Sequence, residues 1–144
     1  EPDLDIAVHA AVTEGYLNAT TVPEAADAFI VAVPTPFEGE NHEPDLSYIE
    51  AASKAIAPVL KKGNLVILES TSPVGATEQM AAWLAEARQD LTFPQTHGES
   101  SDIRIAHCKR NGAILIQCNN SSMMHRFQYI VAICHRKRYV RSQH

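Results

Sequence analysis

Two stretches decide the fold: residues 29–37, FIVAVPTPF, and residues 65–77, LVILESTSPVGAT. Each is a run of apolar, β-prone residues that ends in a turn built from Thr, Ser, Pro and Gly. This combination predicts a buried strand followed by a loop. In an open parallel α/β sheet, ligands bind where the strands end at their carboxyl edge. The two segments therefore predict a site lined by hydroxyl groups and backbone amides at that edge.

Helical patterns flank the two strands. Residues 2–14 predict a helix, and its buried stripe is expected to be Leu4, Val8, Ala11 and Val12. Ser47 and Glu50 fit a capping box at the start of a second helix, and a third is predicted at about 77–88. Shorter elements are expected as one helical turn at 23–27, a loop at 38–45, and short strands at 91–93 and 103–106. This order predicts doubly wound α/β patterning with right-handed crossovers.

The spacing of the glycines limits this assignment. A dinucleotide-binding fold opens with a strand, G-x-G-x-x-G and a helix, and these glycines let the backbone approach the pyrophosphate. The six glycines of this chain lie at positions 15, 39, 63, 75, 98 and 112, and no two have that spacing. The predicted fold class is therefore a partial Rossmann-like, doubly wound parallel sheet that lacks its first βαβ unit.

Charge divides the chain in two. Residues 1–108 hold all 17 acidic residues but only five of the 12 Lys and Arg, which gives a net charge of −12. Residues 109–144 hold the other seven Lys and Arg and no acidic residue. A composition break of this kind marks a boundary. We therefore predict a partial dinucleotide-binding domain over 1–108 and an unrelated basic tail over 109–144.

Composition also excludes several classes of protein. No apolar run approaches the roughly 20 residues needed to span a bilayer, and no secretory signal precedes the first helix. The three cysteines are an odd number without CxxC spacing, which favours a cytoplasmic protein with free thiols. No metal site is expected, because the paired spacing of structural zinc ligands is missing from Cys118, His125, Cys134 and His135.

Three segments resemble one enzyme family. VPTPF at 33–37, HEPDLSYIEAA at 42–52 and APVLKKGNLVILESTSPVG at 57–75 are similar to the UDP-glucose/GDP-mannose dehydrogenase family. Within that family they most resemble the bacterial UDP-N-acetyl-D-mannosamine dehydrogenases. The similarity runs from Glu1 to about Cys108. VPTP alone is a weak signal, whereas the ordered combination that ends in ESTSPVG is specific.

The resemblance implies a cytoplasmic, NAD-dependent oxidoreductase of polysaccharide biosynthesis. Members of the family oxidise the C6 alcohol of a nucleotide sugar to a carboxylate in two hydride transfers, with a thioester on a catalytic cysteine between them. The implied substrate is a UDP-sugar, here UDP-N-acetylmannosamine, and the product is UDP-N-acetylmannosaminuronate. The NAD domain comes first in these enzymes, and this chain corresponds to its middle and end. Intact members of the family are homodimers.

The resemblance carries over to three hydroxyl residues as cofactor contacts. Thr35 resembles the family threonine that touches NAD at the end of a strand, and a solvated turn hydroxyl between two prolines is the alternative. Thr71 resembles the threonine near the nicotinamide that orients a reacting water or substrate. Thr77, at the start of the next helix, is placed to contact the cofactor through its hydroxyl, or to act only as a helix N-cap.

The chain departs from the family after IAHC at 105–108. Family members continue with a segment like C-P-E-R, whose glutamate supports the catalytic water, but here Cys108 is followed by KRN. The family's lysine, asparagine and nucleophilic cysteine have no counterpart. No catalytic residue is therefore assigned, and the chain alone is expected to be inactive. We interpret residues 109–144 as translation in a shifted reading frame, which the coding DNA would decide.

The basic tail leaves a second class of function open. The alternative is a non-catalytic α/β binding module whose cluster at 136–141 contacts nucleic acid or an acidic partner through its Lys and Arg. No nucleic-acid-binding module accompanies the cluster, so a solvated charged terminus is favoured. Residues 127–134, FQYIVAIC, are apolar and β-prone, and they predict an ill-fitting strand or an aggregation-prone segment.

Overall fold

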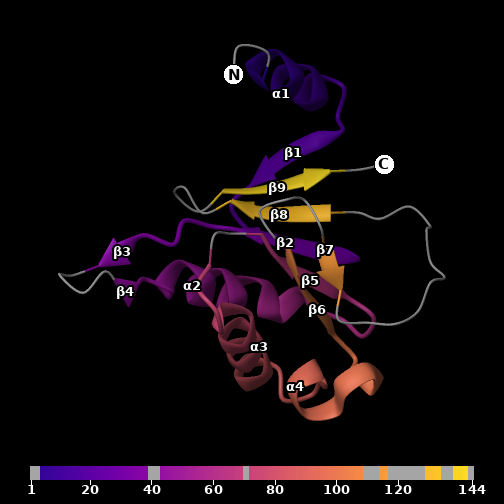
Figure 1. Cartoon of the computed structure of the whole chain (residues 1–144). Coiled ribbons are helices and arrows are strands. Elements are labelled where there is room, and N and C mark those ends of the chain that lie inside the picture. The colour runs from indigo at the N-terminus through magenta and orange to yellow at the C-terminus, as the bar shows by residue number, and fades with distance from the viewer. Residues whose placement is uncertain are drawn as a thin grey trace.

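The computed structural model describes residues 4–38, 43–69, 72–108, 114–116, 129–133 and 138–142. Its helices are α1 (Leu4–Thr13), α2 (Ser47–Ile56), α3 (Ala76–Ala87) and α4 (Pro94–His97), with 3-10 turns η1 (Ala57–Val59) and η2 (Gly98–Ser100). Its strands are β1 (Leu17–Thr20), β2 (Ala28–Ala32), β3 (Phe37–Glu38), β4 (Glu43–Pro44), β5 (Leu65–Leu68), β6 (Arg104–Cys108), β7 (Ile114–Ile116), β8 (Tyr129–Ile133) and β9 (Arg138–Ser142). Figure 1 shows α2 and α3 along one side of the central strands, while α1 stands off beyond β1.

Seven of the described strands form one sheet in the order β1-β9-β8-β2-β5-β6-β7. The centre of the sheet is parallel, because β8, β2, β5 and β6 run in one direction. The outer pairs β6–β7, β8–β9 and β1–β9 are antiparallel, and β3 and β4 form a separate two-stranded hairpin. The parallel centre, with helices packed on it, confirms the predicted α/β fold class.

The hydrophobic core lies between the central strands and two helices. Continuous apolar runs predicted that β2 and β5 are buried, and their side chains are indeed withdrawn from solvent. The helices cover the strands with apolar residues at helical spacing. The fully buried members of this core include Phe29, Val31, Val66, Leu68, Ile49, Ile56, Met80 and Leu84.

The start of α2 differs from the prediction. The predicted capping box is wrong, because Ser47 is the first residue inside the helix and the N-cap residue is Leu46, whose side chain makes no capping hydrogen bond. The Ser47 amide instead donates to Oδ1 of Asp45, which precedes the helix. Glu50 pairs with Lys54 one turn later, at 2.5 Å. The α-helix ends at Ile56 and continues as the 3-10 turn η1, which contains the helix-breaking Pro58.

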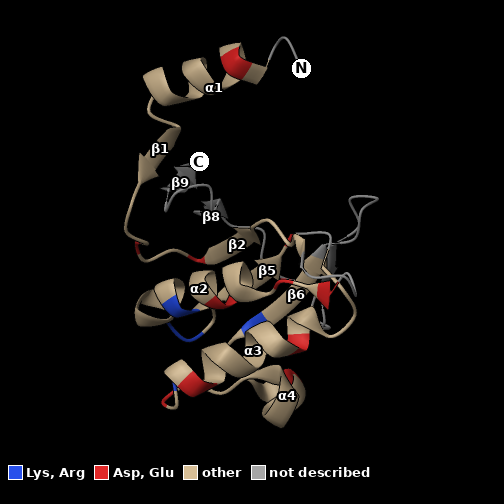
Figure 2. Ribbon diagram, turned by 90° about the vertical axis from the view of Figure 1, so that its left-hand side faces the viewer, with Lys and Arg blue, Asp and Glu red and all other residues tan. Residues whose placement is uncertain are grey.

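Helix α1 forms as predicted, but its apolar stripe is not buried. Leu4, Val8 and Val12 are 59%, 44% and 51% exposed, and Ala11 is only half-buried. The reason is architectural, because α1 lies beside β1 and away from α2 and α3 in both views (Figures 1 and 2). Gly15 follows the helix with a φ of 81°, as expected of a helix stop.

Three shorter predictions are also corrected. Residues 23–27 form no helical turn; the link between β1 and β2 crosses three strand spacings, about 14 Å, which favours an extended path. Residues 91–93 are not a strand, although Leu91 and Phe93 are buried and carry the chain into α4. The predicted loop at 38–45 holds the β3–β4 hairpin. The strands predicted at 29–33 and 103–106 are confirmed as β2 and β6 within two residues at each end.

The tail contributes three strands to the sheet. The strand predicted within 127–134 is confirmed as β8, which pairs with β2 in parallel, from Ala28↔Tyr129 to Ala32↔Ile133. Strands β7 and β9 flank the two ends of the parallel centre. The division of the chain at residue 108 stays a prediction.

Candidate functional site

The carboxyl ends of β2 and β5 lie side by side. The two strands pair in parallel from Ala28↔Leu65 to Val31↔Leu68, so they end at the same edge of the sheet. The Glu69 amide donates to the Val31 carbonyl at 2.8 Å, which joins the strands at the point where their loops begin. The structure thus brings together the two segments that the sequence singled out. Such an edge is where open α/β sheets bind ligands.

The VPTP segment after β2 is anchored on both sides. Val33 is 6% exposed and belongs to the core. The Pro36 carbonyl accepts a hydrogen bond from the Asp45 amide at 2.8 Å, just before α2 begins. Thr35 lies between these anchors and is half-buried. Its backbone is therefore held at the carboxyl edge, where the sequence predicted a cofactor contact.

Gly75 sets the start of α3 at the same edge. Gly75 is the N-cap residue and has a φ of 93°, a backbone conformation that glycine adopts without strain. The Gln79 amide donates to its carbonyl at 3.0 Å. Because a helix of 12 residues begins here, its first amides favour an anion or a polar group at the edge.

Of the three predicted threonines, the structure describes Thr35 and Thr77. Thr77 is half-buried and faces a hollow of about 320 Å³ between α3, α4 and β6, whose other lining residues are Glu78, Ala81, Pro94, Gln95 and Ile105. The N-cap alternative for Thr77 is wrong, because Gly75 holds that position. Thr71 lies outside the described residues, so its relation to Thr35 stays a prediction.

Charge at the carboxyl edge is not suited to phosphates. The exposed Glu69 directly follows β5, and Glu78 lies in the first turn of α3. The described Lys and Arg side chains lie elsewhere: Lys54 is on α2, and Lys61, Lys62, Arg88 and Arg104 belong to segments at the opposite, amino edge of the sheet. In this part of the chain, a phosphate at the carboxyl edge would therefore depend on backbone amides.

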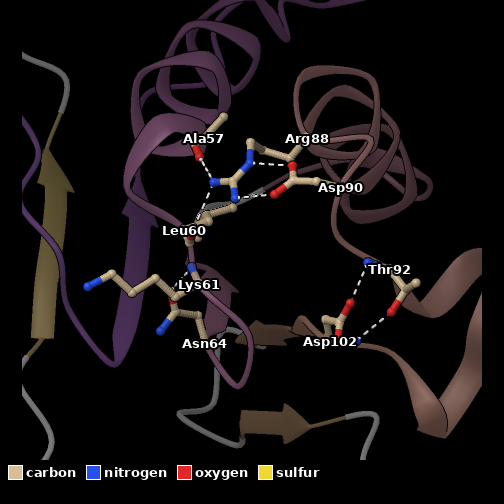
Figure 3. Close-up of polar contacts among 8 residues, drawn as sticks. All are labelled: Ala57, Leu60, Lys61, Asn64, Arg88, Asp90, Thr92 and Asp102. Atoms are coloured by element: carbon tan, nitrogen blue, oxygen red, sulfur yellow. Dashed lines mark hydrogen bonds and ion pairs between the residues drawn. The ribbon is translucent and has the colours of Figure 1, made fainter.

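A polar frame at the amino edge fixes the segments that carry the site (Figure 3). Arg88, which follows α3, donates to the carbonyl oxygens of Ala57 and Leu60, both at 2.8 Å. Its Nε and Nη2 hold the two carboxylate oxygens of Asp90 at 2.7 Å. Hydrogen bonding raises the pKa of Arg88 and lowers that of Asp90. The frame links the end of α3 to the chain that enters β5.

Two further contacts complete the frame. The Thr92 amide donates to Asp102 Oδ2 at 3.0 Å, and the Asp102 amide donates to the Thr92 hydroxyl at 2.8 Å. Hydrogen bonding by the backbone and side chain of Thr92, and then Lys62 at 3.2 Å, lower the pKa of the Asp102 carboxyl. Asn64 accepts from the Lys61 amide at 2.7 Å and donates to the Ala26 carbonyl at 2.9 Å. The sequence did not predict the roles of Arg88, Asp102 and Asn64, because their partners lie up to 38 residues away in the chain.

The end of β6 holds two further residues with titratable side chains, Cys108 and His107. Cys108 is the last residue of β6. His107, next to it, buries an Nδ1 atom that has no hydrogen-bond partner in the described part of the chain. Among those same residues there is no group of three metal-binding side chains, and no helix is long and apolar enough to cross a membrane.

The sheet order and the paired strand ends define a nucleotide-binding α/β domain. Residues 1–121 match the model of the UDP-glucose/GDP-mannose dehydrogenase family, NAD binding domain, and the chain therefore belongs to this family. It is 76% identical over 108 residues to a UDP-N-acetyl-D-mannosamine dehydrogenase of Campylobacter jejuni, which covers 75% of this chain and 26% of that protein. It is 71% identical over 108 residues to an NDP-N-acetyl-D-galactosaminuronic acid dehydrogenase of Ralstonia solanacearum, and the match covers 75% of this chain and 25% of that protein.

Solved structures agree with the family assignment. The UDP-N-acetyl-mannosamine dehydrogenase Cap5O from Staphylococcus aureus is 33% identical, with a TM-score of 0.64 over 76% of this chain and 25% of that one. The chain thus spans about a quarter of the length of the relatives that it matches.

The residues present fit NAD only in part. The adjoining ends of β2 and β5 and the start of α3 place hydroxyl side chains and a helix N-terminus at one edge of the sheet, as a nucleotide requires. The pyrophosphate normally needs a glycine-rich turn after the first strand of the sheet. No such motif occurs in these 144 residues. The described site therefore fits one half of the dinucleotide.

Proposed function

We propose that this chain serves as part of the NAD-binding domain of a UDP-N-acetyl-D-mannosamine 6-dehydrogenase, which oxidises the C6 alcohol of the nucleotide sugar to a carboxylate. The observation that carries the proposal is the adjoining ends of β2 and β5, which bear VPTP and ESTSPVG. The 76% identity to the Campylobacter jejuni enzyme supports the same substrate over UDP-glucose. NAD supplies the hydride acceptor when it is bound.

The roles of the threonines belong to this proposal. Thr35 presents its hydroxyl and turn backbone to the ribose or the pyrophosphate, and Thr71 orients a water or the substrate near the nicotinamide. Thr77 contacts the cofactor from the first turn of α3. Val33 and Gly75 support these contacts, because they fix the two turns against the core and the helix.

The chain alone is proposed to lack catalysis. The segment after Cys108 reads KRN, and the family's nucleophilic cysteine and its lysine have no counterpart. A complete enzyme would supply them from a further domain and would act as a homodimer. An odd number of cysteines without CxxC spacing supports a cytoplasmic location for it.

Calorimetric titration of the full chain with NAD tests the proposal. Thr35→Val should weaken binding about fivefold, because one hydrogen bond to the cofactor is lost. Thr13→Val is the matched control; it removes a hydroxyl that bonds only within α1, to the His9 carbonyl, and should leave affinity unchanged. Equal affinities for both variants, or no heat with NAD, would contradict the proposal.

A further inference from the structure

The strand order of the sheet resembles that of a complete dinucleotide-binding domain. Such a domain orders its strands 3-2-1-4-5-6. The observed order, β1-β9-β8-β2-β5-β6, aligns with it position by position. Strands β2, β5 and β6 then stand in places 4, 5 and 6, and β1, which precedes β2 in the chain, stands in place 3. Places 1 and 2 are taken by β8 and β9, which come from the end of the chain.

The strand directions support this correspondence. Strand β8 is parallel to β2, as a first strand must be. Strand β1 is antiparallel to β9, and β9 is antiparallel to β8, so β1 runs in the same direction as the parallel centre. Only β9 is reversed among the six. Its reversal follows from the four residues that separate it from β8, because so short a connection permits only an antiparallel hairpin.

The segment after β8 lacks the phosphate turn of a true first strand. Residues 134–137 read CHRK and contain no glycine, whereas the phosphate turn needs glycine for close approach of the backbone. We propose that residues 129–142 take the places of the first two strands of the nucleotide-binding sheet and close the edge of β2 without supplying a pyrophosphate turn. The tail thereby fills the edge of β2, and the described carboxyl edge then offers a site for one mononucleotide.

The backbone of β2 gives this proposal a sharp test. The Leu65 and Glu69 amides donate to the carbonyls of Asp27 and Val31, so odd-numbered residues of β2 face β5. In a parallel ladder the amides of successive residues point to opposite neighbours. The amides of Phe29 and Val31 therefore point toward β5, and those of Ile30 and Ala32 point toward β8. The first pair is an internal standard for the second.

Hydrogen exchange of the full chain, followed by NMR, measures both pairs. We expect Ile30 and Ala32 to be protected within about tenfold of Phe29 and Val31, since both ladders would be closed. Exchange of Ile30 and Ala32 at the rate of an unprotected amide would overturn the proposal. So would the absence of backbone NOEs between Ile30 and Val131, which are register partners.

A proline variant tests whether β8 is the strand that protects the Ile30 and Ala32 amides. The register places the Ala132 amide toward β2, so Ala132→Pro removes a donor from that ladder. We expect faster exchange at Ile30 and Ala32 only, while Ala132→Val, which keeps the amide, should behave like the unmodified chain. Unchanged exchange in Ala132→Pro would contradict the proposal. If this variant unfolds, all four amides accelerate, and the NOEs of the unmodified chain decide.

Comparing nicotinamide mononucleotide with NAD tests whether the described edge binds only one half of the dinucleotide. This experiment rests on the proposed function. Nicotinamide mononucleotide should bind within about threefold of NAD, because the adenosine half finds no phosphate turn. Binding of NAD more than about tenfold tighter would overturn the further inference and leave the proposed function standing. If neither ligand binds, the proposed function fails, and hydrogen exchange still decides the place of β8.

Discussion

Replacing Arg88 by alanine should destabilise the chain by about 2 kcal/mol, because two backbone carbonyls each lose one hydrogen bond worth about 1 kcal/mol. The Arg88 side chain is 21% exposed, and its guanidinium donates to the carbonyls of Ala57 and Leu60, residues that are each 2% exposed. Water can reach only part of that site, so it does not fully replace the lost donors. Arg88→Lys should approach the alanine variant, because an ammonium group lacks the guanidinium fork.

Urea unfolding followed by circular dichroism measures the effect. The transition midpoint should fall in Arg88→Ala while the denaturant slope stays constant. Asp90→Asn is the matched control; it keeps both carbonyl contacts and changes a carboxylate that is 63% exposed, so its shift should be much smaller. A loss in Asp90→Asn as large as in Arg88→Ala, or no loss in Arg88→Lys, would refute the assignment to the carbonyl contacts.

Other substitutions test separate parts of the account. Leu84→Ala, at a fully buried position, should cost about 2–5 kcal/mol in urea unfolding, whereas Leu4→Ala, at a 59% exposed position, should change stability by less than about 0.5 kcal/mol; equal losses would mean that α1 is covered. Gly75→Ala should destabilise by about 1 kcal/mol because of the positive φ, and no loss would contradict the N-cap geometry. Asp102 has a pKa below its ordinary 3.8, so its stabilisation is present above that pH and is lost as the pH falls through the lower value. The stability difference between Asp102→Asn and the unmodified chain should therefore shrink in acid, and a difference independent of pH would contradict the Thr92 contacts.

Local patterns predicted the centre of the fold. Apolar runs predict strands at β2 and β5, and helical spacing predicts helices at α2 and α3. The tertiary packing of these four elements agrees with their local patterns. The same reasoning failed for the stripe of α1, because burial depends on which layer covers a helix and not on its own pattern. It also failed at Ser47, because the helix begins one residue earlier than a capping box requires and Asp45 accepts from the Ser47 amide instead.

Contacts between segments far apart in the chain could not be predicted from the sequence. The place of β8 beside β2 depends on pairing across 101 positions, and the periodicity of 127–134 predicts a strand without a neighbour. The polar frame around Arg88 and Asn64 likewise depends on backbone carbonyls, which carry no sequence signal. The sequence predicted where the candidate site lies, because the pattern shows where β2 and β5 end. It did not predict that Thr77 lines a hollow beside α4.

The central claim is that the adjoining ends of β2 and β5 form half of an NAD site. Titrating the isotope-labelled full chain with NAD and mapping the amide shift changes tests it most directly. The account predicts that the changes gather at 33–36, at Glu69 and at 75–77, on the two turns that the structure places at one edge. Changes confined to α1, β1 or the amino edge of the sheet, or none at saturating NAD, would contradict it.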